Sequence, residues 1–246
     1  MRPLVAVTTS VVTSSAVVPN RPSYYVDSVY TESLASCGAA PVLIPAHAPW
    51  REGSVHDLMC MFSGLLVTGG PVLPAECPPD QTIPPLRDQD PDRYDFEIDL
   101  ILEATRQRIP ILGICRGMQV MNEALGGATH LNLLLAGVTK LDHNQGNMPE
   151  SDGYHPITVS PGSLLSRLTD AKDMIVNSFH RQGVEHPGPG VRDCAVSSDG
   201  VVEAIEFGDS FCLGLQFHPE RMMHVPCMKG IMDGFVEACT SVSGRR

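Results

Sequence analysis

One stretch decides the fold: Ile109-Pro-Ile-Leu-Gly-Ile-Cys115-Arg-Gly-Met-Gln-Val-Met-Asn-Glu-Ala-Leu-Gly-Gly127. Its first part is a short apolar run, which is typical of a buried strand. Apolar residues then recur at helical spacing as far as Gly126, and glycine commonly ends a helix. Between the two predicted elements lies Cys115, with a glycine two residues away on each side. The stretch predicts a strand, a sharp turn at a cysteine, and a helix.

A cysteine in such a turn has the surroundings of a nucleophile. Flanking glycines permit the strained strand-to-helix turn that lifts a nucleophilic side chain above a sheet. The thiol then lies at the N-terminus of the next helix, where the helix dipole and free N–H groups favour the thiolate. The alternative is a buried structural cysteine, since a free cysteine packs like a small apolar side chain. The two glycines favour the nucleophile.

The composition is that of a globular protein. The 246 residues are 43% hydrophobic and 18% charged, which supports a substantial core and argues against disorder. The formal net charge of −11 disfavours nucleic acid as a partner, because phosphate binding needs a basic face. No stretch approaches the ~18 apolar residues that a membrane span needs. We therefore expect neither nucleic acid nor a membrane as a partner.

Eight cysteines are spread along the chain without a Cys-x-x-Cys pair. That spacing fits neither a zinc site nor a small disulfide framework, and it favours a reducing compartment. The apolar run at the N-terminus is broken at Thr8 and Thr9, which favours a strand over a secretory signal. We expect a cytoplasmic protein.

The first half of the chain alternates predicted strands and helices. Helices are expected around residues 26–37 and 55–62 and from Pro91 onward, and the intervening strands are expected at residues 4–9, 41–45 and 64–70. Residues 10–23 and the proline-rich residues 71–90 are predicted loops. This alternation requires a parallel sheet with helices on both faces, so the fold class is α/β.

The second half of the chain has a different pattern. Strand candidates follow one another closely, at residues 155–160, 174–179, 194–198, 201–207 and 211–217. Asp199-Gly200 is a hairpin signal between two of them, and an amphipathic helix follows at residues 228–239. We therefore expect an antiparallel β portion added to the mostly parallel sheet. No repeat or low-complexity linker divides the chain, so residues 1–246 are expected to form a single domain.

A cysteine nucleophile needs a base, and the base needs an orienting group. Among nine histidines, only His218 stands at the end of a predicted core strand beside a carboxylate, in Gln216-Phe-His-Pro-Glu220. Pro219 favours an extended backbone at His218, and residues two apart in an extended segment share a face. Glu220 can then fix the imidazole tautomer and leave the other nitrogen for Cys115.

The remaining histidines show no ligand spacing, and no metal site is expected. His155 begins a predicted strand and is interpreted as structural. His180 follows a strand, so a pocket role and a structural role stay equally open. The others are interpreted as surface or structural residues: His47, His56, His130, His143, His186 and His224.

Five segments together resemble the class I glutamine amidotransferase superfamily, and within it the branch of free-standing gamma-glutamyl hydrolases, which includes gamma-glutamyl-gamma-aminobutyrate hydrolases. They are Gly69-Gly70, Gly113-Ile-Cys-Arg-Gly-Met-Gln119, Asn177-Ser-Phe-His180, Asp199-Gly-Val-Val-Glu-Ala-Ile205 and Gln216-Phe-His-Pro-Glu220. The resemblance extends from Leu4 to the last helix. The cysteine turn and the His-Pro-Glu motif are highly specific together, and the other segments support them. The resemblance implies the flavodoxin-like sheet of that superfamily.

The resemblance also implies a reaction and the residues for it. It implies a triad of Cys115, His218 and Glu220, and hydrolysis of a small gamma-glutamyl amide through a glutamyl thioester. Neither a metal nor an organic cofactor is required. An oxyanion hole is implied at the backbone N–H groups of Gly70 and Arg116. Contacts to the glutamyl head are implied for Gln119, Ser178, Phe179 and His180. A homodimer is left open.

Two positions depart from the family pattern. Family members often carry an acidic residue just after the glycine pair, where this chain has Pro71-Val-Leu-Pro74. This loop borders the expected acyl pocket, so the identity of the leaving amine is open. His180-Arg181 also replaces a common His-His pair.

Three other functions compete with an independent gamma-glutamyl hydrolase. The chain could be a glutaminase subunit that supplies ammonia to a separate synthetase. It could be a non-catalytic binding protein on an inherited fold. It could also be a cysteine hydrolase that acts on another acyl group. Activity on gamma-glutamyl amides without an added protein separates the first two functions from the hydrolase.

Overall fold

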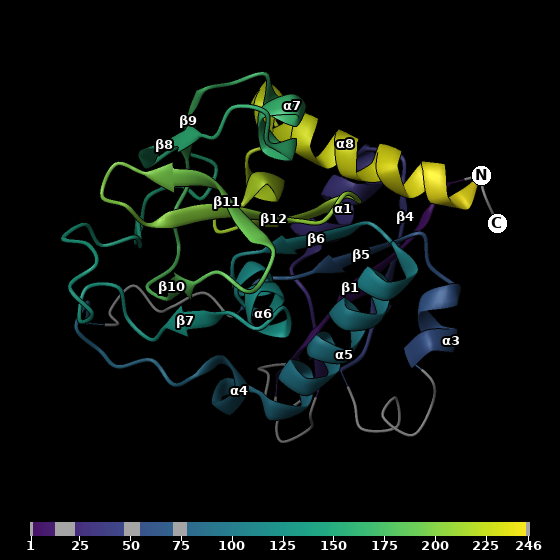
Figure 1. Ribbon diagram of the computed structural model, residues 1–246, viewed down its shortest axis with the longest axis horizontal. Helices are drawn as coiled ribbons and strands as arrows, with labels where there is room; N and C mark the ends of the chain where they lie inside the picture. The colour runs from purple at the N-terminus through teal and green to yellow at the C-terminus, as the bar shows by residue number, and fades with distance from the viewer. Residues whose placement is uncertain (1, 13–22, 47–54, 71–77, 245–246) are drawn as a thin grey trace.

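The computed structural model describes residues 2–12, 23–46, 55–70 and 78–244 (Figure 1). A nine-stranded sheet runs through the molecule in the order β4-β1-β5-β6-β13-β12-β11-β8-β9. In that order the strands are β4 (Ala40–Ile44), β1 (Leu4–Thr8), β5 (Gly64–Val67), β6 (Ile111–Ile114), β13 (Cys212–Leu215), β12 (Val202–Phe207), β11 (Val191–Ser197), β8 (His155–Val159) and β9 (Asp173–Val176).

The sheet has a parallel half and an antiparallel half. Neighbouring strands from β4 to β13 pair in parallel. From β13 to β9 they pair antiparallel, with β11 and β12 joined by the expected hairpin at Asp199-Gly200. The strands β5, β6 and β13 are buried along their whole length, whereas β8 and β9 alternate buried and exposed residues. The predicted α/β fold with an antiparallel addition is confirmed.

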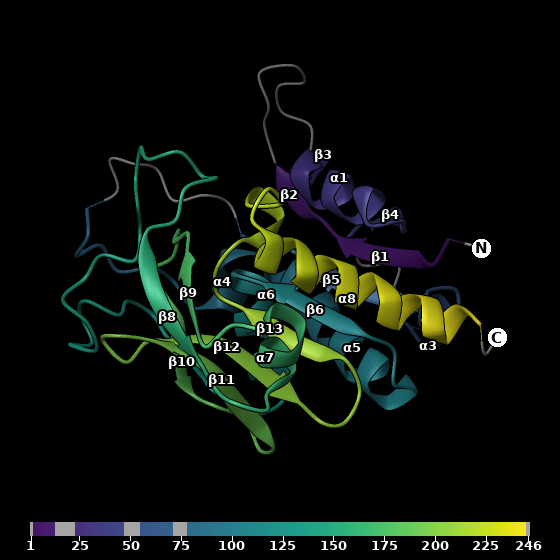
Figure 2. The same ribbon diagram turned by 90° about the horizontal axis from the view of Figure 1, so that it is seen from above.

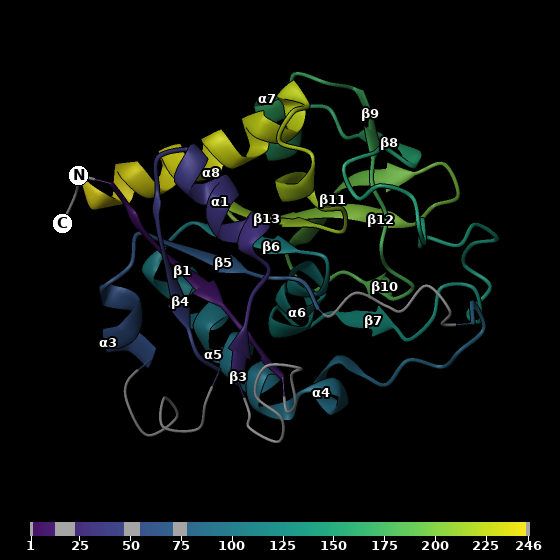
Figure 3. The ribbon, with the colours of Figure 1, turned by 180° about the vertical axis from the view of Figure 1, so that it is seen from behind.

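Helices cover both faces of the sheet (Figures 2 and 3). The helices α1 (Ser28–Ser36), α7 (Leu164–Thr169) and α8 (Pro226–Ser243) share one apolar core with the sheet, including Leu34, Leu165 and Phe235. The helices α3 (Val55–Cys60), α5 (Pro91–Gln107) and α6 (Arg116–Ala124) build a second core on the other face, including Met59, Phe96 and Val120. No helix of the described ranges is long and apolar enough to cross a membrane.

Several short elements were not predicted. The predicted loop 10–23 contributes β2 (Ser10–Val12) and β3 (Ser23–Tyr25), which pair antiparallel. The predicted loop 71–90 ends in the four-residue helix α4 (Leu86–Gln89), while Pro71–Pro74 lies outside the described residues. A second small sheet pairs β7 (Ala128–His130) with β10 (Gly183–His186). The helix α7 was also missed. None of these short segments contains an apolar run or a clear alternation by which to recognise it.

The parallel half positions the site. The strands β5, β6 and β13 are neighbours, and their carboxyl ends lie at the same edge of the sheet. Gly70 follows β5, Cys115 follows β6, and His218 follows β13. Open α/β sheets commonly bind ligands at such carboxyl ends.

Candidate active site

Cys115 occupies the sharp turn that the sequence predicts. It joins β6 to α6 with φ +53° and ψ −109°, a backbone conformation that non-glycine residues rarely adopt. Its carbonyl oxygen accepts from the N–H of Gln119, and its own N–H donates to Leu215. The side chain is partly exposed, at the start of α6. The thiol is therefore accessible and near the free N–H groups of a helix.

The flanking glycines are required by close contacts rather than by positive φ. A Cβ at Gly117 would lie 2.1 Å from the backbone oxygen of Val67, and a Cβ at Gly113 would lie 2.3 Å from the sulfur of Met121. The neighbouring strand β5 and the helix α6 thus approach the turn as closely as two glycines allow.

His218 and Glu220 lie beside this cysteine. The Nδ1 atom of His218 is 2.7 Å from Oε1 of Glu220, and both side chains are buried. Residues 219–221 form a 3-10 helix, η1 (Pro219–Arg221), so the expected extended segment ends at His218. It is this turn, rather than strand alternation, that brings the carboxylate of Glu220 back to the imidazole.

The environment of His218 favours the charged ring. Burial lowers its pKa, but the negative charge of Glu220 and the hydrogen bond to Cys115 outweigh burial and raise the pKa to about 10. A protonated imidazole beside the sulfur stabilises a thiolate at Cys115. The same proton can later pass to a leaving group.

Asn177 fixes the backbone of His218. Its side-chain oxygen accepts from the N–H of His218 at 2.8 Å, and its nitrogen donates to the carbonyl of His218 at 3.1 Å. Asn177 is fully buried. The motif Asn177-Ser-Phe-His180 marked this segment, but its sequence did not reveal that the asparagine positions a histidine 41 residues later.

Gly70 and Arg116, the residues predicted for an oxyanion hole, border the same small cavity as Cys115 and His218. The loop before Gly70 is stabilised by Arg93, which donates hydrogen bonds to the carbonyls of Thr68 and Gly69 at 3.0 and 2.9 Å. Glu97 ties this arginine to Arg116 by two ion pairs, one of them 2.8 Å long. The turn at residues 68–70 is thus linked to the start of α6.

The ion-pair network of Arg93, Glu97 and Arg116 was not predicted. Its three side chains are at most 5% exposed. Burial raises the pKa of Glu97, but the charges of Arg116 and Arg93 outweigh it, and the pKa of Glu97 lies below its usual range. Charged residues on an amphipathic helix normally face solvent, so nothing in the pattern of residues 91–107 indicated a buried pair.

The cavity has a volume of about 90 Å³. Three of the four residues predicted to hold a glutamyl head line it, namely Gln119, Phe179 and His180. The fourth, Ser178, is fully buried and donates to the carbonyl of His143, so its hydroxyl does not face the cavity. Arg181, the departure from the family's His-His pair, also lines the cavity, and it is paired with Asp142.

A second cavity of about 370 Å³ lies against the first. Gly70, Gln89, Arg116 and His218 line both of them. The rest of its lining comes mainly from β2, β3 and the start of α1, including Tyr25, Asp27 and Tyr30. Two compartments therefore meet beside the imidazole of His218.

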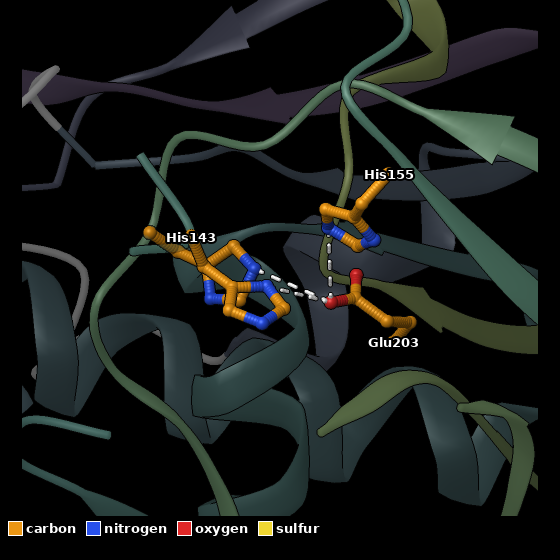
Figure 4. A group of neighbouring side chains, drawn as sticks. His143, His155 and Glu203 are labelled. Atoms are coloured by element: carbon orange, nitrogen blue, oxygen red, sulfur yellow. Dashed lines mark ion pairs between the residues drawn. The ribbon is translucent and has the colours of Figure 1, made fainter. Parts of the chain in front are cut away.

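A separate buried cluster has the side chains of a metal centre. His143, His155, His180 and Glu203 present ligand atoms that all lie within 4.8 Å of one another. Figure 4 labels three of them, His143, His155 and Glu203. His143, interpreted from the sequence as surface or structural, is fully buried there, and His155 and His180 are buried beside it. The sequence spacing gave no signal, because the four residues are spread over positions 143–203 without the short spacing typical of a metal site. Of the remaining histidines, His56 pairs with Glu103, and His47 lies outside the described residues.

The sequence is similar to known proteins along almost its whole length. The model of the peptidase C26 family matches residues 3–220. A gamma-glutamyl-gamma-aminobutyrate hydrolase of Escherichia coli O157:H7 is 33% identical over 219 residues, which cover 85% of this chain and 84% of that protein. A candidate glutamine amidotransferase of Mycobacterium tuberculosis is 31% identical, covering 100% of this chain and 77% of that protein.

The fold is similar to that of a solved structure. A candidate GMP synthase subunit from Thermoplasma acidophilum superposes with a TM-score of 0.65, covering 100% of this chain and 98% of the other. The two sequences are 16% identical, so this likeness concerns the fold alone.

Proposed function

The chain belongs to the peptidase C26 family and is a glutamine amidotransferase-like hydrolase, and from this premise we propose that it cleaves gamma-glutamyl amides of small amines. The products are glutamate and the free amine. The observation that carries the proposal is the thiol of Cys115, held in a strained turn beside the buried pair of His218 and Glu220 at the border of a cavity.

The first half of the reaction forms a thioester. The thiolate of Cys115 attacks the gamma-carbonyl carbon, and the carbonyl oxygen becomes an oxyanion. Backbone N–H groups of Gly70 and Arg116 are proposed to hold this oxyanion, and losing one such donor typically costs ~3 kcal/mol of barrier. His218 gives its proton to the amine nitrogen as the C–N bond breaks.

The second half releases glutamate. His218, now neutral, takes a proton from water, and the hydroxide attacks the thioester carbon. The C–S bond breaks and Cys115 leaves as the thiolate, which returns the site to its starting charge. Glu220 orients the imidazole in both halves and stabilises its charged form.

The two cavities support an assignment of the two ends of the substrate. The smaller one, lined by Gln119 and Phe179, suits the compact glutamyl head. The larger one, lined by Tyr25 and Asp27, suits the amine. The scissile bond is then proposed to lie where the two cavities meet beside His218, within the smaller cavity that Cys115 lines.

Two polar groups support recognition of the charged head. The Nη2 atom of Arg116 is buried without a hydrogen-bond partner among the described residues, and Arg116 borders both cavities. It is proposed to pair with the α-carboxylate. The amide nitrogen of Gln119 already donates to Gln182 and Gln216, so its oxygen is the atom that can accept from the α-amino group.

A panel of substrates tests this function. Purified protein alone is expected to release glutamate from several gamma-glutamyl amides, including gamma-glutamyl-gamma-aminobutyrate, with kcat/KM values within a few hundredfold of one another. Apolar differences in the amine are worth only ~1–3 kcal/mol each. Alpha-linked glutamyl amides are expected to be poorer by a factor on the order of 10⁴, because a site that pairs the charged head rejects a misplaced one.

Matched cysteine variants serve as controls. Cys115→Ala is expected to lose activity on every substrate, whereas Cys60→Ala, at an exposed position on α3, is expected to retain it. Fast hydrolysis of free glutamine that requires a second protein would establish an amidotransferase subunit instead. Full activity in Cys115→Ala would refute the assigned nucleophile.

A further inference from the structure

The buried cluster of His143, His155, His180 and Glu203 brings side chains from β8, the loop before it, the segment after β9, and β12 to one point. His143 lies in the loop before β8, His155 begins β8, His180 follows β9, and Glu203 lies on β12. None of the four is more than 5% exposed. Figure 4 shows His143 and His155 directed toward the carboxylate of Glu203.

The outer nitrogen of each histidine is fixed by an acceptor. The Nε2 atom of His143 lies 3.0 Å from Oδ2 of Asp199. Nδ1 of His155 faces the carbonyl of Pro156 at 3.3 Å, and Nδ1 of His180 faces the carbonyl of Gln182 at 3.0 Å. A carbonyl or carboxylate oxygen only accepts, so each of these outer nitrogens carries the proton.

When the three rings are neutral, their inner nitrogens present lone pairs to the carboxylate of Glu203. Each inner nitrogen and both carboxylate oxygens are buried and lack a hydrogen bond among the described residues. Four side chains with only acceptor atoms between them repel one another unless a cation lies between them. Protonating all three rings would place three positive charges within a few ångströms of one another. One divalent ion satisfies the same atoms without that repulsion.

The three distances from the carboxylate of Glu203 fit a small tetrahedral ion. Oε1 of Glu203 lies 3.2 Å from Nδ1 of His143, 3.6 Å from Nε2 of His155 and 3.5 Å from Nε2 of His180. Ligands bound to zinc at ~2.0–2.1 Å in a tetrahedron lie ~3.3 Å apart. We propose that His143, His155, His180 and Glu203 bind one Zn²⁺ ion in a closed four-coordinate site.

The surroundings have the second layer of contacts that zinc histidines normally have. Such histidines donate their other N–H to a carboxylate or a backbone carbonyl, which fixes the tautomer and the ring. Asp199, Pro156 and Gln182 provide these acceptors here. Asp199 is itself held by Thr139 and Ser197. The Asp-Gly motif thus has a role beyond the hairpin turn.

Four protein ligands leave no position for a substrate, so the ion has a structural role. It holds His180, within the segment 177–182 that forms one side of the smaller cavity. That segment carries Asn177, which binds the backbone of His218, and Gln182, whose carbonyl accepts from Gln119. The ion would therefore stabilise the wall of the cavity and take no part in the thioester chemistry.

Metal analysis of the intact chain tests the proposal without reference to activity. Protein purified without a nickel column and dialysed against metal-free buffer is expected to contain one zinc per chain, as measured by inductively coupled plasma mass spectrometry. After zinc is removed with a chelator, titration with Co²⁺ alone is expected to give the visible spectrum of four-coordinate cobalt, saturating at one equivalent. The same titration with Zn²⁺ should displace the cobalt.

Variants with matched controls locate the ion. Glu203→Gln and His155→Gln are expected to lose the metal, and Glu237→Gln and His186→Gln, at exposed positions, are expected to keep it. Asp199→Asn should weaken zinc binding by ~10–100-fold, the usual effect of losing a partner of a metal-bound histidine. The wild-type measurements stand even if a ligand variant does not fold. The proposal would be overturned by wild-type protein that contains no stoichiometric metal and gives no 1:1 cobalt spectrum. A stoichiometric metal other than zinc would also overturn it. So would a Glu203→Gln variant that binds zinc as tightly as the wild type does.

Discussion

At His218 two opposing effects act on one proton. Burial favours the neutral ring, whereas Glu220 and Cys115 favour the charged ring, and the pKa rises from 6.5 to about 10. The folded state thus retains a proton that the unfolded chain has lost between these two values. The stability that His218 contributes is complete below pH 6.5 and disappears as the pH approaches 10.

This linkage gives a prediction for the free energy of unfolding. Between pH 6.5 and 10 the contribution of His218 to the free energy of unfolding should fall with pH, by up to ~1.4 kcal/mol per pH unit. Glu220→Gln removes the charge that raises the pKa, so its slope should be shallower. Urea denaturation at a series of pH values measures both slopes. Glu237→Gln, the same change at an exposed position, should keep the wild-type slope. Equal slopes in the wild type and in Glu220→Gln would show that Glu220 does not hold the proton.

Single residues were predictable where their role is local. Cys115 was recognisable because its glycines and its strand-to-helix context lie within a few positions of it, and the pair of His218 and Glu220 because they lie two positions apart. Asn177 and Glu97 were not recognisable as positioning residues, since their partners lie far away in the sequence. Buried charge in an amphipathic helix looks the same in sequence as exposed charge.

At the scale of elements, the contact between β5 and the cysteine turn is the tightest constraint. The backbone oxygen of Val67 leaves no room for a Cβ at Gly117. Gly117→Ala should therefore separate β5 from α6, reduce the free energy of unfolding by on the order of 2–3 kcal/mol and abolish activity. Chemical denaturation and the gamma-glutamyl assay measure these effects.

Gly244→Ala is the matched control for that substitution. Gly244 has φ −72° at the end of α8. A Cβ there would lie 3.8 Å from the backbone oxygen of Thr240, which is an ordinary van der Waals distance. The free energy of unfolding of Gly244→Ala should equal that of the wild type or exceed it by up to ~1 kcal/mol, because alanine is a better helix former than glycine. A Gly117→Ala variant as stable and active as Gly244→Ala would contradict the close contact.

The elements with a strong apolar pattern were predicted, and the short elements without one were not. The helices α5 and α8 show helical periodicity, and the central strands β5, β6 and β13 are buried along their whole length. The predicted strand 174–179 ends early, at Val176, because Asn177 and Ser178 turn their polar groups to His218 and to the residues around His143. Such tertiary hydrogen bonds override a local pattern of alternation.

At the scale of the molecule, the prediction is that the chain unfolds as one unit. The helix α1, near the N-terminus, shares an apolar core with α8, near the C-terminus. The strand β6 at residues 111–114 pairs with β13 at residues 212–215, so segments far apart in the sequence belong to the same sheet. No separable piece is visible among the described residues. Far-UV and near-UV circular dichroism should therefore give coincident transitions in urea. Two separate transitions would divide residues 1–246 into more than one domain.

The pairing of β6 with β13 also determines when the proposed active site can be completed during synthesis of the chain. Cys212 pairs with Ile111 and Leu215 with Ile114, so β6 leaves the ribosome before its later neighbour, β13, has been synthesised. At ~5–20 residues per second, roughly a hundred residues take about five to twenty seconds. Throughout that interval Cys115 has no His218 beside it, so by the proposed mechanism the nascent chain is inactive. The apolar edge of β6 is open for just as long, which makes this strand the place where a stalled chain would aggregate or recruit a chaperone.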